Sequence, residues 1–315
     1  MAPNVSNTAV KDPVLNRFRK EVSDMIADGN TYAVLDGAHF DDLQDELLKV
    51  NISSRSLFLS GGDNQWRRDG PWLVALSDRR VNAHIMDLTL EKPCAVFWSC
   101  PSGETALYKH LRSINRILVP DDRIEQNLAT PLTRVIYERV LFRHWDPNVM
   151  GALLPSFTEA QFSRVLGPAK AITMNATKYG GIKRLSNPGS FPPAPKGPLK
   201  ITTTEIGKTN DLMGEATVTR ISNYLRKVAP YQTAKMDNFE LSKATQQYIK
   251  DGREYGVKSE AALARWSYMQ VVTSGKLTQN PDVYKVMTAK DPTVSADRRV
   301  QILLQASIKH AEEKR

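Results

Sequence analysis

The sequence predicts a mixed, layered α/β domain at residues 12–180 and a small all-helical domain at residues 212–315. Short apolar runs typical of strands alternate with helical patterns in the first half of the chain. Five prolines lie within residues 183–200, and the last hundred residues carry helical periodicity only. We therefore expect residues 181–211 to form a Pro/Gly-rich linker, in which residues 201–206 could add one more strand.

The elements of the first domain follow one another in a regular order. Asp12 and Pro13 begin a helix that should run to about residue 28, because Asp caps a helix and Pro suits its first position. Strands are expected at residues 32–35, 57–59, 72–76, 95–99, 116–119 and 140–145. Helices are expected at residues 41–50 and 102–113, and Ser102 should cap the second one. The pattern at residues 81–90 fits neither a helix nor a strand unambiguously.

Residues 140–168 contain the most specific local signals. The alternating strand pattern at residues 140–145 is followed by Asp146 and Pro147, which predict a helix start. Thr158 and Gln161 have the spacing of a capping box at the start of a second helix, and a Gly-Pro pair ends it. A strand and two helices are therefore expected to form a rigid corner of the fold.

The C-terminal hundred residues predict a small helical bundle. Residues 215–228 place four apolar side chains on one helical face. Asp237 and Glu240 form a second capping box, and Ser259 and Ser295 are each placed to cap a further helix.

Charge is unevenly distributed along the chain. The net charge is +9 over 315 residues. Residues 171–315 hold 23 basic and 13 acidic residues, a net of +10, so the first 170 residues carry −1. The basic half could face an acidic partner or nucleic acid, although a solvated helical surface is the favoured interpretation. The sequence shows no apolar leader, and Cys94 and Cys100 lack a CxxC spacing, so we expect the protein to be cytoplasmic. No apolar run is long enough to cross a bilayer, so we expect no membrane span.

No set of catalytic residues is evident, so we expect neither enzymatic activity nor a cofactor or metal ion. The five histidines lack a metal-binding spacing, and no serine lies in a GxSxG motif. Gly207, Lys208 and Thr209 resemble the end of a phosphate-binding loop, but Thr202 occupies the position of the required first glycine. His110 and His144 are interpreted as structural.

Two groups of residues are candidates for structural or binding roles. Arg143 and Asp146 are expected to form a structural salt bridge across the strand-to-helix turn, while Asp36 follows a strand without an evident partner. Trp66, Arg67 and Arg68 lie in a polar loop at residues 61–70. Exposed Trp and Arg are enriched at binding hot spots, so these three are candidate partner-binding residues; Trp66 folding back on the core is the alternative.

Several motifs resemble one bacterial family. They are Phe-Arg-His-Trp-Asp-Pro at residues 142–147, with Arg143, Asp146 and Pro147; Leu-Leu-Pro at residues 153–155, with Leu154 and Pro155; the first strand with Asp36; the Pro-x-Leu-Val strand with Pro71 and Leu73; and the His-Leu-Arg helix with His110. In this order they resemble the Tap or Tec adaptor/chaperone family of the type VI secretion system. His144 departs from the family, which usually has an aromatic residue there.

The resemblance implies a non-enzymatic cytoplasmic adaptor of a Gram-negative bacterium. Such an adaptor binds a cognate effector toxin, loads it onto the VgrG spike protein and is not itself secreted. The helical tail agrees with the resemblance. The alternative is a nucleic-acid-binding protein that uses the basic helical C-terminal half.

Overall fold

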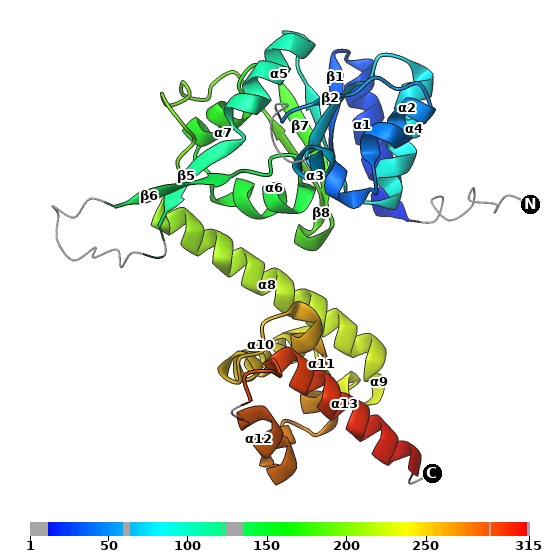
Figure 1. Ribbon diagram of the computed structural model, residues 1–315, viewed down its shortest axis with the longest axis vertical. Coiled ribbons are helices and arrows are strands. Elements are labelled where there is room, and N and C mark those ends of the chain that lie inside the picture. The colour runs from blue at the N-terminus through cyan, green and yellow to red at the C-terminus, as the bar shows by residue number, and fades with distance from the viewer. Residues whose placement is uncertain (1–11, 59–63, 122, 124–134, 290, 314–315) are drawn as a thin grey trace, which may run out of the picture. The chain divides into compact units, whose positions relative to one another are not determined.

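The computed structural model describes residues 12–58, 64–121, 123, 135–289 and 291–313 (Figure 1). The chain divides into two compact units, Met1–Asp211 and Leu212–Arg315. The first unit is a mixed α/β structure and the second is helical, so the predicted fold class is confirmed.

A six-stranded sheet forms the centre of the first unit, in the order β2-β3-β1-β4-β7-β8. All neighbouring strands are antiparallel. The alternation of helices and strands therefore does not reflect parallel crossovers here. The strands are β1 (Thr31–Asp36), β2 (Arg55–Ser56), β3 (Pro71–Ala75), β4 (Ala95–Ser99), β7 (Ala171–Ala176) and β8 (Gly181–Ser186).

Helices cover both faces of this sheet, which gives three layers (Figure 1). One face packs on α1 (Pro13–Ala27), α2 (Leu43–Lys49) and α4 (Arg79–Glu91), and the other on α5 (Glu104–Ser113), α6 (Pro147–Leu153) and α7 (Glu159–Leu166). Along β1 the buried side chains alternate between the two faces: Ala33 and Leu35 belong to the first core, Tyr32 and Val34 to the second. Both cores thus depend on the central strand.

The remaining strands of the first unit form a separate two-stranded ribbon, β5 (Arg116–Pro120) and β6 (Tyr137–Leu141). The expected strand at residues 140–145 is therefore wrong in its extent, because the chain leaves β6 at Leu141. A regular strand would place His144 and Trp145 on opposite faces, whereas both are buried in the same core. Burial of these two rings outweighs continued strand pairing.

Two other local expectations differ from the structure, and one ambiguity is resolved by it. The strand expected at residues 57–59 is wrong: the short β2 ends at Ser56, Leu57 and Phe58 form a bend, and Leu59 lies outside the described residues. Helix α5 is capped by Gly103 and makes no side-chain cap bond, so Ser102 is not its cap. The ambiguous residues 81–90 belong to helix α4.

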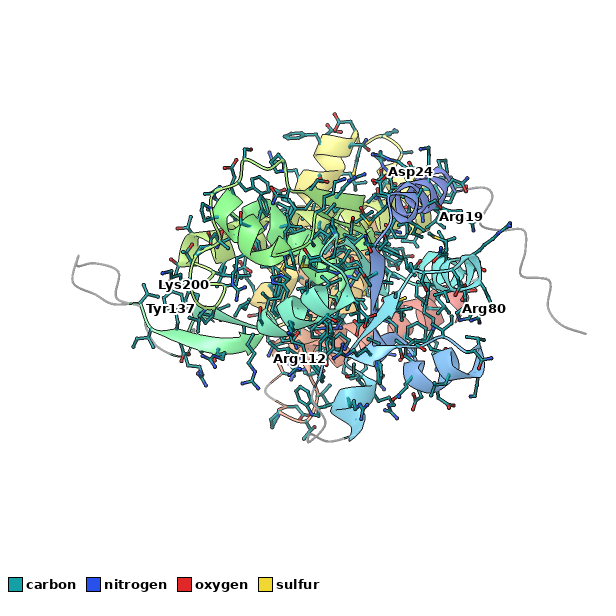
Figure 2. The ribbon with its side chains drawn as sticks, turned by 90° about the horizontal axis from the view of Figure 1, so that it is seen from above. Arg19, Asp24, Arg80, Arg112, Tyr137 and Lys200 are labelled. Carbon is teal, nitrogen blue, oxygen red and sulfur yellow. The ribbon has the colours of Figure 1, made fainter. Side chains whose placement is uncertain are left out.

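The expected linker at residues 181–211 is instead packed on the first unit. Strand β8 occupies its first six residues, and no strand forms at residues 201–206, where helix α8 (Thr203–Val228) begins. Leu199 and Ile201 are buried in the core. Lys200 pairs with Leu118 of the ribbon, and its ammonium lies 3.9 Å from the centre of the Tyr137 ring (Figure 2). The prolines therefore shape a surface-bound segment that is held at both ends.

The second unit is built from the rest of α8 and five further helices: α9 (Pro230–Thr233), α10 (Asn238–Glu254), α11 (Glu260–Val272), α12 (Pro281–Thr288) and α13 (Ala296–Glu313). Trp266 on α11 is fully buried at its centre, among apolar residues from the neighbouring helices. The capping box of Asp237 and Glu240 is present, and Ser259 caps α11, as the sequence predicts.

Candidate partner-binding surface

The end of strand β1 is the point at which distant motifs meet. Asp36, the last residue of β1, is completely buried, and its backbone N–H donates a hydrogen bond to the carbonyl of Cys94. Its side chain accepts a hydrogen bond from the backbone N–H of Ala38 and one of 2.5 Å from the Arg143 guanidinium. A charge-assisted bond of this kind secures the turn after β6 to the central strand.

Asp146 occupies the other side of Arg143. One carboxylate oxygen caps α6 by accepting hydrogen bonds from the N–H groups of Asn148 (2.8 Å) and Val149 (3.3 Å). The second oxygen lies 3.5 Å from the Arg143 guanidinium. The predicted cap and the predicted Arg143–Asp146 pair are both present. Arg143 nevertheless makes its shorter contact with Asp36, a partner that the sequence did not indicate.

Gly37 brings a second segment to the same place. Its N–H donates to the carbonyl of Gly70, and a Cβ atom at residue 37 would lie 2.1 Å from the carbonyl oxygen of Arg68. Only glycine permits this approach of two backbones. Pro71 then starts β3 opposite Asp36, and Leu73 continues it into the core. The end of α3 (Asn64–Arg68) is therefore fixed beside the end of β1.

Helix α3 carries the three candidate binding residues. Trp66 is 63% exposed, and Arg67 and Arg68 are also exposed. The polar loop expected at residues 61–70 is wrong over residues 64–68, which form α3, and residues 61–63 lie outside the described part of the chain. The alternative, in which Trp66 folds back on the core, is wrong. Instead Trp72 fills the core beneath and donates its indole N–H to the carbonyl of Arg68 at 3.3 Å.

The combination of these side chains is suited to binding a protein. Exposed Trp and Arg side chains provide large contact areas and several hydrogen-bond donors. Arg68 and the half-exposed Arg143 both adjoin the end of β1, Arg68 through its backbone beside Gly37 and Arg143 through Asp36. Trp66 and Arg67 precede Arg68 on α3. We define the α3 surface as Trp66, Arg67 and Arg68 together with Arg143.

His110 holds the end of α7. Its Nε2 lies 2.7 Å from the carbonyl oxygen of Val165, and burial lowers the pKa of its imidazole. Gly167, the C-cap of α7, has a φ of +54°, and a Cβ atom there would lie 2.3 Å from the His110 ring. The family-motif histidine and this glycine therefore form a matched pair, which is a structural role.

His144 is enclosed by aromatic rings. Its ring centre lies 5.1 Å from that of Trp145, 5.9 Å from Phe142 and 6.1 Å from Trp98, and Nε2 lies 2.9 Å from the side-chain oxygen of Asn115. Complete burial holds the pKa of His144 at about 3, so the ring is neutral at neutral pH.

Leu154 and Pro155 lie in a short 3₁₀ turn after α6. Leu154 is buried in the same core as the rings around His144, whereas Pro155 is exposed and continues the turn. These two motif residues shape the corner rather than the α3 surface.

The described residues contain neither a metal-binding cluster nor a membrane-spanning helix. In this part of the chain no three His, Cys, Asp or Glu side chains gather as a metal ion would require. None of the described helices has the length and apolar character needed to cross a membrane.

Comparison with protein families gives a match over part of the chain. Residues 31–164 match the model described as "Domain of unknown function (DUF4123)". This segment contains β1, α3 and the Arg143–Asp146 corner, and it ends within α7. Comparisons with curated proteins and with solved structures found no match.

Proposed function

Residues 31–164 belong to the DUF4123 family, the domain known from type VI secretion effector adaptors, and on this premise we propose that the chain is an adaptor for one effector toxin. The resemblance indicated by the sequence motifs is thereby confirmed. In the proposed function, the protein binds its effector in the cytoplasm, delivers it to the VgrG spike and is not secreted. It acts by binding and not by catalysis.

One observation beyond the family supports this proposal: the α3 surface exposes a tryptophan on a rigid base. Trp66 is exposed while the backbone beneath it is tied to β1 through Gly37 and to β3 through Trp72. Because the backbone that carries Trp66 is already ordered, less conformational entropy is lost when a partner covers the ring. The proposal places the effector contact on the α3 surface.

The first experiment is co-expression with the toxin that the proposed function expects to be encoded next to this protein. The two should co-purify, and the toxin's soluble yield should rise. The complex should survive about 0.5 M salt, because exposed charge pairs are largely screened there whereas apolar burial is not. Trp66→Ala should weaken the complex at least tenfold without shifting the thermal midpoint. Tyr284→Ala, which removes another exposed aromatic ring, is the matched control.

Deleting the gene provides the decisive test in cells. Delivery of the neighbouring toxin should stop while the secretion machine continues to fire with other effectors. Normal secretion of that toxin in the deletion strain would refute the adaptor function. Loss of all secretion would instead indicate a structural part of the machine.

A second candidate function, nucleic-acid binding, is supported by the second unit. Residues 212–315 hold 17 basic and 11 acidic residues, and Tyr231 (92%) and Phe239 (75%) are strongly exposed there. Basic residues next to exposed aromatic rings suit single-stranded nucleic acid. Affinity for an oligonucleotide should then fall steeply between low and moderate salt, whereas effector affinity should change little.

A further inference from the structure

Strand β8 forms one edge of the six-stranded sheet. It pairs with β7 over six residues, whereas β2 at the opposite edge is only two residues long. In the described part of the chain, no strand pairs with the outer side of β8. An edge strand presents backbone N–H and C=O groups that another extended chain can bond.

The register determines which residues present these groups. The N–H of Asn187 donates to the carbonyl of Lys170, in line with the β7–β8 register. Hydrogen-bonded pairs alternate along an antiparallel ladder, so Leu185 and Lys183 bond to β7. The β1–β4 pair agrees. The N–H of Cys100 donates to the carbonyl of Asn30, so Trp98 and Val96 bond to β1 while Ser99 and Phe97 bond to β7. Ile172 and Met174 of β7 are then left to bond to Leu185 and Lys183.

The outward backbone groups therefore belong to Ile182, Arg184 and Ser186. No backbone hydrogen bond from these three residues to other described elements is present outside the β7–β8 ladder. Together they offer three donors and three acceptors over the length of a typical short strand.

The segment of the chain that contains β8 is positively charged. Residues 160–204 contain seven Lys or Arg residues and no Asp or Glu. Lys183 and Arg184 point to opposite faces of the sheet, because successive strand residues alternate. Neither forms a salt bridge within the described residues. An added strand with acidic side chains would thus meet a cation on either face.

We propose that β8 binds an extended, acidic segment of a partner protein as a seventh strand of the sheet. Backbone hydrogen bonds to Ile182, Arg184 and Ser186 supply affinity, and Lys183 and Arg184 select acidic side chains. Only a polypeptide matches the alternating donors and acceptors of the edge, which favours a protein segment over nucleic acid. This surface is separate from the α3 surface, and the proposal does not rest on the adaptor function.

Amide hydrogen exchange measured by NMR tests the proposal on the full chain. The probe is an acetylated eight-residue peptide of alternating threonine and glutamate. In the free protein, the N–H groups of Ile182, Arg184 and Ser186 should exchange at least tenfold faster than those of Lys183 and Leu185. The peptide should slow these three at least tenfold. The same peptide with every backbone nitrogen methylated keeps its charge but should give no protection.

Two proline variants test the alternation directly. Arg184→Pro removes an outward donor and should leave the thermal midpoint nearly unchanged while peptide affinity falls at least tenfold. Lys183→Pro removes a donor to β7 and should lower the midpoint by several degrees. Arg184→Gln keeps the N–H and loses the charge, so its affinity should fall by less than that of Arg184→Pro.

Several results would overturn the proposal. Equal protection of the five amides in the free protein would mean that the edge is already covered. Equal binding of the methylated peptide would mean a general anion-binding surface. Sedimentation showing a dimer that Arg184→Pro dissociates would make the occupant a second copy of this chain.

Discussion

The guanidinium of Arg143 lies 2.5 Å from the Oδ2 atom of Asp36, although 107 residues separate the two. Asp36 is completely buried and Arg143 is 41% exposed. This pair attaches the corner that starts α6 to the end of the central strand. The charge of Asp36 is therefore balanced by a residue from a distant part of the sequence, and the same arginine belongs to the α3 surface.

Arg143→Gln should destabilise the protein, because a buried carboxylate loses its cation. We expect a loss of about 2–3 kcal/mol in the free energy of unfolding, below the full cost of breaking a buried pair since Arg143 is partly solvated. Urea unfolding measures it. The control is Arg17→Gln, which breaks the exposed Arg17–Glu21 pair and should cost at most about 0.5 kcal/mol. Equal losses of unfolding free energy in the two variants would show that the Arg143–Asp36 contact contributes no more than an exposed ion pair.

Asp146→Ala should cost about 1–3 kcal/mol, since it removes a helix cap and a partner of Arg143 together. Asp12 is a matched control: it also caps a helix that begins with proline, and it accepts a hydrogen bond from Val14, but no described salt bridge involves it. Asp12→Ala should therefore cost only about 1 kcal/mol. An unchanged thermal midpoint for Asp146→Ala would contradict the structural role assigned to Asp146.

Gly167→Ala should be among the most damaging small substitutions. The new methyl group would meet the His110 ring, and the positive φ adds strain, so we expect a loss of about 2–4 kcal/mol. Gly103→Ala has a positive φ but no atom within 4 Å of the new Cβ, so its loss should stay near 1 kcal/mol. If His110→Ala does not rescue part of the Gly167→Ala loss, the two residues are not a matched pair.

His144 should make the protein sensitive to mild acid. Unfolded His144 binds a proton below its ordinary pKa of 6.5, whereas burial holds the folded pKa at about 3. Its stabilising contribution is complete above pH 6.5 and is lost as the pH falls toward 3, by at most about 1.4 kcal/mol per unit. His144→Phe should flatten the dependence of unfolding free energy on pH between 6.5 and 4.5. Parallel curves for the two proteins would contradict this assignment.

Limited trypsin digestion should distinguish a free linker from a packed segment. Lys196 is exposed in irregular chain, whereas Lys183 and Arg184 lie in β8 and Lys200 bridges to the ribbon. Cleavage after Lys196 should precede cleavage at the other three sites, because proteases require locally extended, accessible backbone. Mass spectrometry of the early fragments identifies the site. Early cleavage at Lys183 would mean that β8 opens readily.

Several features could be predicted from the sequence because they depend on residues within four positions of one another. The cap formed by Asp146 and Pro147 and the capping boxes at Thr158 and Asp237 are examples. A cap needs only a side-chain oxygen next to its own helix, so spacing alone identifies it. The family motifs could also be found in the sequence, because each is a short run of residues and the motifs occur in the order typical of the adaptor family.

The tertiary structure alone decided which distant segments meet. The residues around Asp36 and Arg143 do not indicate that the two form a pair. The sequence did not predict strand β8 either, because its strand propensity is weak and its pairing with β7 stabilises it. The burial of His144 and Trp145 likewise ended β6 early. Hydrogen bonds within one turn are determined by neighbouring residues, whereas strand pairing and buried ion pairs depend on free energies summed over the whole core.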